Sequence, residues 1–327
     1  MKHRVFGREQ RRVSEIGLGT WQIGGDWGEV SDEVADSILT TAVDNGIDFF
    51  ATAVVYGGGL SEKRIARFLA NTDADVLVAT KLGRGAEPGW PANFTPEAIR
   101  RHAEESLCRL GVPSLDLTQL HCIPTEVLQE GNCFDTLRTL QAEGVIRRFG
   151  ASVESMEEAH LCIHQEGLSS LQIIFNIFRQ KPAGELFELA ARKGVALIVR
   201  LPLASGLLSG KFSLETEFGS GDHRSYNRDG QAFNVGETFA GLCFEKGVGL
   251  VDELREMIPP DYSMVDLALR WILDFDAVTT IIPGASRPGQ VLGNIRAAQL
   301  PRLSPELHDR LSEFYESRVK AHIRGPY

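Results

Sequence analysis

Three residues of this sequence, Tyr56, Lys81 and His121, could together protonate a carbonyl oxygen. A phenol has a pKa of about 10, too high for an effective acid at neutral pH, and a nearby ammonium lowers that pKa by favouring the phenolate. An imidazole can donate a hydrogen bond that holds the carbonyl group in place. Each residue alone also fits an ordinary role in a turn, at a solvated strand end or in a structural hydrogen bond. Their convergence is what would make a catalytic site.

The elements that carry these residues alternate between short apolar runs and amphipathic segments of helical period, such as residues 31–45, 61–70 and 95–110. Such alternation indicates a parallel sheet, and eight units in about 250 residues or more predict a (β/α)8 TIM barrel, here a single domain of residues 1–327. The expected strands are residues 16–18, 47–50, 76–80, 115–120, 146–151, 171–175, 195–199 and 278–282.

Strand order explains why the three residues should meet. Tyr56 follows the second expected strand, Lys81 ends the third and His121 ends the fourth. In a barrel the carboxyl ends of the strands lie at one face, so we expect the three side chains in one pocket.

Two alternatives fit the sequence less well. A doubly wound open sheet would have a Gly-x-Gly-x-x-Gly turn after its first strand, but Gly17 and Gly19 are followed by Gln22 in the third position. The segment from Gly206 to Lys211 is superficially similar to an ATPase phosphate loop. It has Ser205 in place of the first Gly and Phe212 in place of the Ser or Thr, so an ATPase is disfavoured.

Flanking segments complete the expected barrel. Residues 1–13 predict a small hairpin that closes its floor, and Thr95-Pro96 and Ser304-Pro305 predict helix starts. Residues 213–241 follow the seventh strand and have no clear apolar period. A loop of this length is typical of a lid, which we expect to lie over the catalytic face and to become ordered over a bound cofactor.

Bulk composition excludes several classes of function. The chain has 327 residues and a net charge of −10, which disfavours nucleic acid and anionic membrane partners. It has no apolar run long enough to span a membrane, and its charged start predicts no secretory signal. The five cysteines are scattered without a Cys-x-x-Cys pair, so we expect no metal site and a cytoplasmic location. The oligomeric state stays open.

Several motifs resemble those of the aldo-keto reductases across nearly the whole chain. Thr52-Ala53 and Tyr56-Gly57 are similar to the second-strand signature Asp-Thr-Ala followed by Tyr-Gly, with Ala51 at the position of the Asp. The other similar motifs are Gly17-Leu18-Gly19-Thr20-Trp21, Phe149-Gly150-Ala151-Ser152, Gln172 with Asn176, Pro202 through Lys211, and Ile282 through Arg287 with Gln290 and Asn294.

The resemblance implies a TIM barrel that binds NADP(H) without a Rossmann domain and interconverts carbonyl compounds and alcohols. It implies Tyr56 as the proton donor, Lys81 as the group that tunes it and His121 as the group that orients the carbonyl. Trp27 and Trp90 are candidates for the wall of the substrate pocket. The implied cofactor contacts are Thr20, Trp21, Ser152, Gln172, Arg200, Pro202, Leu203, Ser205, Gly206, Leu208, Lys211, Gly284, Ser286, Arg287, Gln290 and Asn294.

The sequence departs from the family pattern at three positions, Ala51, Val153 and Gly293. Ala51 matters most, because without a carboxylate partner a desolvated Lys81 disfavours its ammonium form. The chain is then either an engineered inactivating variant or a natural member with reduced activity. The alternative function is a nicotinamide-binding regulatory or redox-sensing subunit with little turnover.

Overall fold

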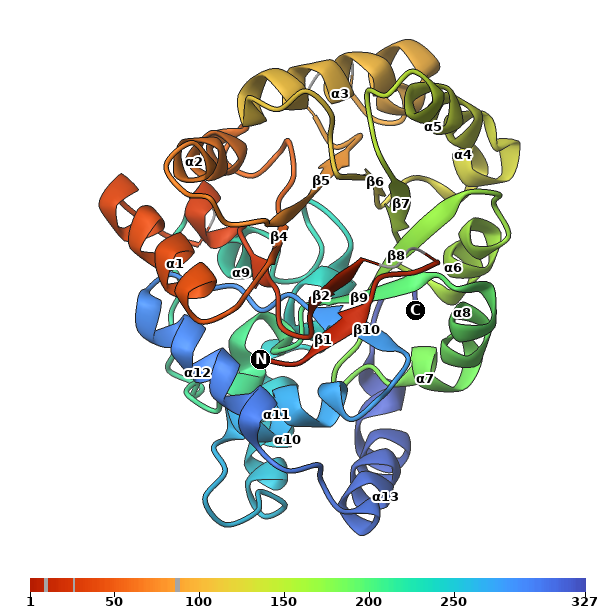
Figure 1. The fold of residues 1–327 in the computed structure, drawn as a ribbon. Helices are drawn as coiled ribbons and strands as arrows, with labels where there is room; N and C mark the ends of the chain where they lie inside the picture. The colour runs from red at the N-terminus through yellow and green to blue at the C-terminus, as the bar shows by residue number, and fades with distance from the viewer. Residues whose placement is uncertain (9–10, 26, 86–88) are drawn as a thin grey trace.

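The computed structural model describes residues 1–327 except 9–10, 26 and 86–88. Eight parallel strands pair in chain order, and helices surround them (Figure 1). The expected (β/α)8 TIM barrel is confirmed. Its strands are β3 Leu18–Gly19, β4 Phe49–Ala51, β5 Leu77–Leu82, β6 Leu117–His121, β7 Phe149–Ser152, β8 Leu168–Ile174, β9 Ala196–Arg200 and β10 Val278–Ile281.

The barrel closes between its first and last strands. Gly17 donates a backbone hydrogen bond to Ile281 at 2.8 Å, and Gly19 bridges Gly284 in parallel. A Cβ atom at Gly19 would lie 2.6 Å from the carbonyl oxygen of Ile282, so the close approach of the two strands requires glycine. The first strand, β3, begins two residues later than expected and has two residues in place of three. Ile16 forms only an isolated bridge to Ile281 and is not part of a regular ladder.

The helices pack their apolar faces against the outside of the barrel. Thr95 and Ser304 cap their helices by accepting hydrogen bonds from the backbone of Ala98 and Leu307, as expected from the Pro that follows each. The helices are α1 Asp32–Asp44, α2 Leu60–Leu69, α3 Pro96–Leu110, α4 Thr125–Glu130, α5 Asn132–Ala142, α6 Met156–Ile163, α7 Lys181–Glu185, α8 Phe187–Lys193, α9 His223–Tyr226, α10 Phe244–Arg255, α11 Met264–Leu273, α12 Pro288–Gln299 and α13 Pro305–Phe314.

A small hairpin closes the barrel floor, as expected. Strands β1 His3–Val5 and β2 Arg12–Ser14 pair antiparallel, and Figure 1 shows them across one end of the barrel. Phe6 and Val13 are buried there against strand residues such as Phe49 and Leu117. The floor is therefore apolar and sealed, which leaves the opposite end for chemistry.

The 213–241 segment is more ordered than its sequence suggests. It contains α9 and two short turns of 3-10 helix, η4 Val235–Glu237 and η5 Phe239–Gly241. No helix among the residues described is both long and apolar enough to cross a bilayer.

Candidate active site

Tyr56, Lys81 and His121 meet at the carboxyl end of the barrel. The Nζ atom of Lys81 lies 3.1 Å from the phenol oxygen of Tyr56 and 4.7 Å from the centre of its ring. The rings of Tyr56 and His121 meet edge to face, with centroids 6.2 Å apart. The structure thus brings together the three side chains that the strand order predicts will meet.

Ala51 ends β4 and forms part of the wall of a cavity at this end of the barrel. The ammonium of Lys81, which is almost fully buried, donates a 2.7 Å hydrogen bond to the backbone carbonyl of Thr52. That carbonyl and the phenol of Tyr56 are the hydrogen-bond partners found for Lys81 within the described part of the chain.

Burial is the largest cause of the pKa shifts of Lys81, Tyr56 and His121. It lowers the pKa of Lys81 to about 7, and the nearby guanidinium of Arg200 adds to this effect. Burial, with the Glu237 carboxylate, raises the pKa of Tyr56, and burial with the Arg84 guanidinium holds the pKa of His121 well below its ordinary value. At neutral pH His121 is therefore a neutral imidazole, and Lys81 is divided between ammonium and amine.

A cavity of about 840 Å³ extends from Tyr56 and His121 to the start of α12, and Lys81 lies behind its wall. Its walls come from strand ends, from the turns that follow them and from the 213–241 segment. Most residues expected to hold a cofactor line it: Thr20, Trp21, Gln172, Arg200, Pro202, Leu203, Ser205, Gly206, Lys211, Gly284, Ser286 and Gln290.

Four expected cofactor residues do not line the cavity. Leu208 and Asn294 are buried outside its walls, and Arg287 is exposed on the surface at the start of α12. Ser152 is fully buried, with its hydroxyl 3.6 Å from the thiol of Cys122. Of these four, the exposed Arg287 side chain is the one free to reach a ligand without repacking the core.

Aromatic side chains join the 213–241 segment to Tyr56. The ring of Trp21 stacks on Tyr56 at 5.6 Å, and His223 packs 4.7 Å from Trp21 and 4.3 Å from Trp27. Trp27 and Trp90, the two expected pocket walls, both line the cavity, although Trp90 is about half exposed. The segment therefore covers the catalytic face through ring contacts.

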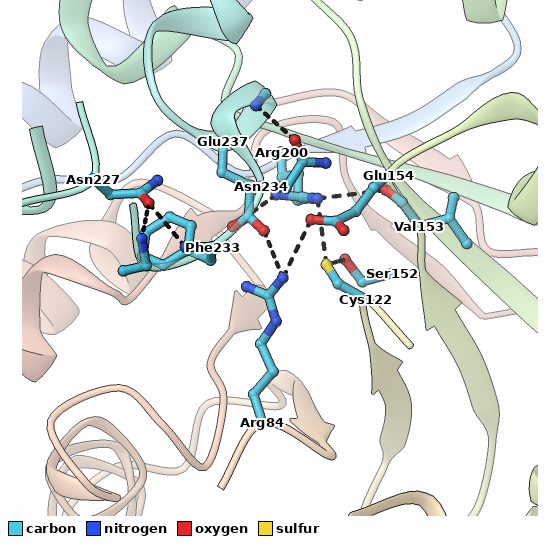
Figure 2. Close-up of polar contacts among 12 residues, drawn as sticks. Arg84, Cys122, Ser152, Val153, Glu154, Arg200, Asn227, Phe233, Asn234 and Glu237 are labelled. Carbon is cyan, nitrogen blue, oxygen red and sulfur yellow. Dashed lines mark hydrogen bonds and ion pairs between the residues drawn. The ribbon is translucent and has the colours of Figure 1, made fainter. Parts of the chain in front are cut away.

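A cluster of charged residues, of which the sequence analysis named only Arg200, lies beside this site (Figure 2). The Nη2 atom of Arg84 lies 2.8 Å from Glu237 and 3.2 Å from Glu154, and Arg200 lies 3.3 Å from Glu237. Arg200 ends β9, and Arg84 and Glu154 lie two residues after β5 and β7, which is a signal that sequence reasoning could have used. Glu237 belongs to the 213–241 segment, where no pattern marks it.

The two carboxyl groups of this cluster titrate in opposite directions. Burial and the adjacent Glu237 raise the pKa of Glu154. The guanidiniums of Arg84 and Arg200 hold the pKa of Glu237 well below its ordinary value, although burial opposes them. Glu237 is therefore ionised and Glu154 protonated at neutral pH. Donor atoms of Cys122 and both carboxyls lie within 4.8 Å of one another, yet two guanidiniums already bind there and disfavour a metal cation.

A parallel barrel that gathers a phenol, an amine and an imidazole around a cavity at its carboxyl end defines a barrel-type oxidoreductase. The family model described as "Aldo/keto reductase family" matches residues 15–316. The chain therefore belongs to the aldo/keto reductase family, whose general reaction interconverts carbonyl compounds and alcohols with a nicotinamide cofactor.

Individual relatives are distant in sequence but match most of the chain. The chain is 29% identical to the uncharacterized oxidoreductase YqkF of Bacillus subtilis over 312 residues, 94% of each chain. It is 28% identical to the aldo-keto reductase YhdN of the same organism over 285 residues, 85% of this chain and 83% of the relative.

Two proteins of known structure share the fold over 99% of this chain and 98% of their own. The glycerol dehydrogenase AKR11B4 from Gluconobacter oxydans has a TM-score of 0.79 at 28% identity. The holo form of the aldo-keto reductase AKR11C1 from Bacillus halodurans has a TM-score of 0.79 at 27% identity, and its apo form has 0.72.

Proposed function

We propose that this protein reduces aldehydes, ketones or sugars with NADPH and catalyses the reverse oxidation of alcohols. The observation that carries the proposal is the 3.1 Å contact between Lys81 and the phenol of Tyr56, with the ring edge of His121 beside them. A phenol, an amine and an imidazole at one end of a ligand-sized cavity supply the proton and the hydrogen bond that carbonyl reduction needs.

The residues around the cavity fit a nicotinamide dinucleotide. The Nε atom of Arg200 is buried and has no hydrogen-bond partner among the residues described, and Gln172 also faces the cavity. At the far end, Lys211 and Ser286 offer an ammonium and a hydroxyl group to phosphates. The higher similarity to the holo than to the apo form of one relative supports this assignment. When bound, the reduced dinucleotide supplies a hydride.

The protein's own groups handle the proton. The phenol of Tyr56 donates it to the carbonyl oxygen of the substrate, and neutral His121 donates a hydrogen bond to the same oxygen. The Nδ1 atom of His121 is buried and lacks a partner among the described residues, so one ring nitrogen is not committed elsewhere. Lys81 contacts the phenol oxygen and favours the phenolate whenever it carries its proton.

Ala51 reduces this activity without removing it. Lys81 stays beside Tyr56 through the carbonyl of Thr52, but its pKa of about 7 leaves only part of the population charged. The same observation favours a second candidate, a nicotinamide-binding regulatory or redox-sensing subunit with little turnover. Measured turnover distinguishes the two.

The test is NADPH oxidation with a panel of aldehydes, ketones and sugars. We expect Tyr56→Phe to abolish turnover and to leave the Kd for NADPH within about threefold, because the phenol acts on the substrate oxygen. Tyr262→Phe, at a site remote from the cavity, is the matched control. Equal losses of turnover and NADPH affinity in Tyr56→Phe would assign Tyr56 a structural role. No turnover of any substrate by the unmodified chain would favour the second candidate.

A further inference from the structure

The charged cluster places a guanidinium on the substrate side of the cavity. Arg84 follows β5, between the strands that carry Tyr56 and His121, and its side chain lines the same cavity. Apart from burial, its charge has the largest effect on the pKa of His121, larger than that of Lys81. Arg84 therefore shares a cavity wall with Tyr56 and His121, the residues proposed to bind the carbonyl of a substrate.

Only some of the hydrogen-bond donors of the Arg84 guanidinium are engaged by the carboxyl groups beside it. Both ion pairs found for it in the described part of the chain are made by Nη2, to Glu154 and to Glu237, and its guanidinium also lies 5.8 Å from the centre of the Phe233 ring. Figure 2 shows the side chain rising toward these carboxyl groups, with the dashed lines to both of them leaving the same terminal nitrogen. A guanidinium has five N–H donors in a planar fork, so donors remain that can bind a further anion.

The cluster also gathers positive charge at one point of the cavity. Two guanidiniums, those of Arg84 and Arg200, share the Glu237 carboxylate. Glu154 also contacts Arg84, but burial beside Glu237 raises its pKa, so it offsets less of their charge. A buried excess of positive charge is costly unless an anion compensates it. The chain as a whole has a net charge of −10, so this local excess is not a general property of its surface.

The phosphates of the proposed cofactor do not explain Arg84. The cationic groups near the proposed phosphate positions, Lys211 and Arg287, follow β9 and β10, on the other side of the barrel mouth. The nicotinamide ring of NADPH carries no negative charge. The anion that Arg84 can compensate is therefore part of the substrate.

We propose that the preferred substrates are carbonyl compounds that carry a carboxylate, and that Arg84 determines this preference by binding that carboxylate. The proposal rests on the proposed reductase function of the same site. Glu237 holds the guanidinium through Nη2, and the carboxylate of the substrate accepts hydrogen bonds from the remaining N–H groups. Arg84 is a specificity-determining residue and takes no part in proton transfer.

The test compares an acid with its neutral ester. Steady-state kcat/KM is measured with saturating NADPH for 4-oxobutanoate and methyl 4-oxobutanoate, which differ in charge and share the reacting aldehyde. We expect the protein to prefer the acid by at least ~10-fold. Arg84→Gln should lower kcat/KM for the acid by ~10–100-fold, mainly through KM, and change that for the ester by less than about threefold. Arg192→Gln, on the exposed surface of α8, should change neither.

A binding measurement keeps the two proposals separable. Calorimetry with butanoate and with butanamide, at saturating NADPH, should show tighter binding of the acid in the unmodified chain and no preference in Arg84→Gln. Turnover of the ester with no preference for the acid would overturn the Arg84 proposal and leave the reductase intact. If neither aldehyde is reduced but butanoate binds through Arg84, the anion site stands and the reductase fails. Equal binding of butanoate and butanamide would overturn the anion site.

Discussion

The Nζ atom of Lys81 donates a 2.7 Å hydrogen bond to the carbonyl oxygen of Thr52, the residue directly after Ala51. The strand backbone thus holds the side chain beside Tyr56 with no carboxylate at position 51. A carbonyl has only a partial negative charge, so it orients the ammonium but cannot offset the cost of burying a full charge. Position and protonation of Lys81 are therefore controlled separately in this protein.

Restoring the carboxylate should restore proton transfer. We expect Ala51→Asp to raise kcat by ~10²–10⁴-fold, the usual contribution of a well-placed proton-transfer system, because the carboxylate favours the charged form of Lys81. The Kd for NADPH should change little. Ala51→Asn is the matched control, since it adds polar atoms without charge. Equal kcat values in all three forms would show that position 51 does not limit the reaction.

The pH dependence of the rate should follow the protonation of Lys81. Burial lowers the pKa of Lys81 to about 7, so the side chain is charged below that pH and neutral above it. We expect kcat/KM for aldehyde reduction to fall as pH rises through about 7, since the charged form favours the phenolate of Tyr56. In Ala51→Asp the fall should move to higher pH. A profile that is the same in both forms, or that rises through pH 7, would contradict this assignment.

Arg287 should set the preference for NADPH over NADH. Its exposed guanidinium precedes Pro288 at the start of α12, where the amide groups of a helix also favour anions. We expect Arg287→Ala to weaken NADPH binding by ~10-fold in a fluorescence titration and to leave the Kd for NADH within about threefold. Arg296→Ala, later on the same helix, provides the control. Similar losses for both cofactors would argue against a contact with the extra phosphate.

Low pH should destabilise the folded protein, because His223 must then be protonated. Burial lowers the pKa of this fully buried imidazole to about 4, below the value of about 6.5 expected in an unfolded chain. The unfolded state thus binds more protons as pH falls from about 6.5 towards 4, and stability is lost over that range, by about 2 kcal/mol at pH 5.

We therefore expect His223→Phe, which keeps a ring between Trp21 and Trp27, to be the more stable form at pH 5. Thermal unfolding of both forms at pH 7.5 and 5 measures the difference. The exposed His322→Gln should behave like the unmodified chain. Parallel losses of stability in His223→Phe and the unmodified chain would show that another group is responsible.

The sequence could predict the parts of this molecule that depend on local pattern and chain order. Tyr56, Lys81 and His121 come together because consecutive strands of a barrel are neighbours, so their placement needs no long-range information. The pairing of Arg84 with Glu237 was not predictable in this way. It joins a strand end to a distant segment without apolar period, and the fold of that segment depends on contacts with the barrel that it covers.

Exact strand bounds and side-chain directions were also beyond sequence reasoning. Leu208 and Asn294 belong to motifs that resemble cofactor contacts, yet the structure buries both outside the cavity. Whether a side chain in a turn faces the cavity or the core depends on backbone angles, and the turn that carries Leu208 includes the left-handed residues Ser205 and Gly206. Such turns are set by tertiary packing as much as by local residue type.

The distribution of indole rings gives this protein a built-in optical reporter. Three of its four tryptophans, Trp21, Trp27 and Trp90, line the cavity, and the fourth, Trp271, is buried among phenylalanines of the outer core. Its intrinsic emission is therefore largely a property of the cavity. A molecule that enters, or a segment that withdraws from Trp21 and Trp27, changes the surroundings of most emitting groups while the barrel stays as it is. Binding at the site can thus be followed by the tryptophan emission of the unlabelled protein, even for ligands that the protein does not convert.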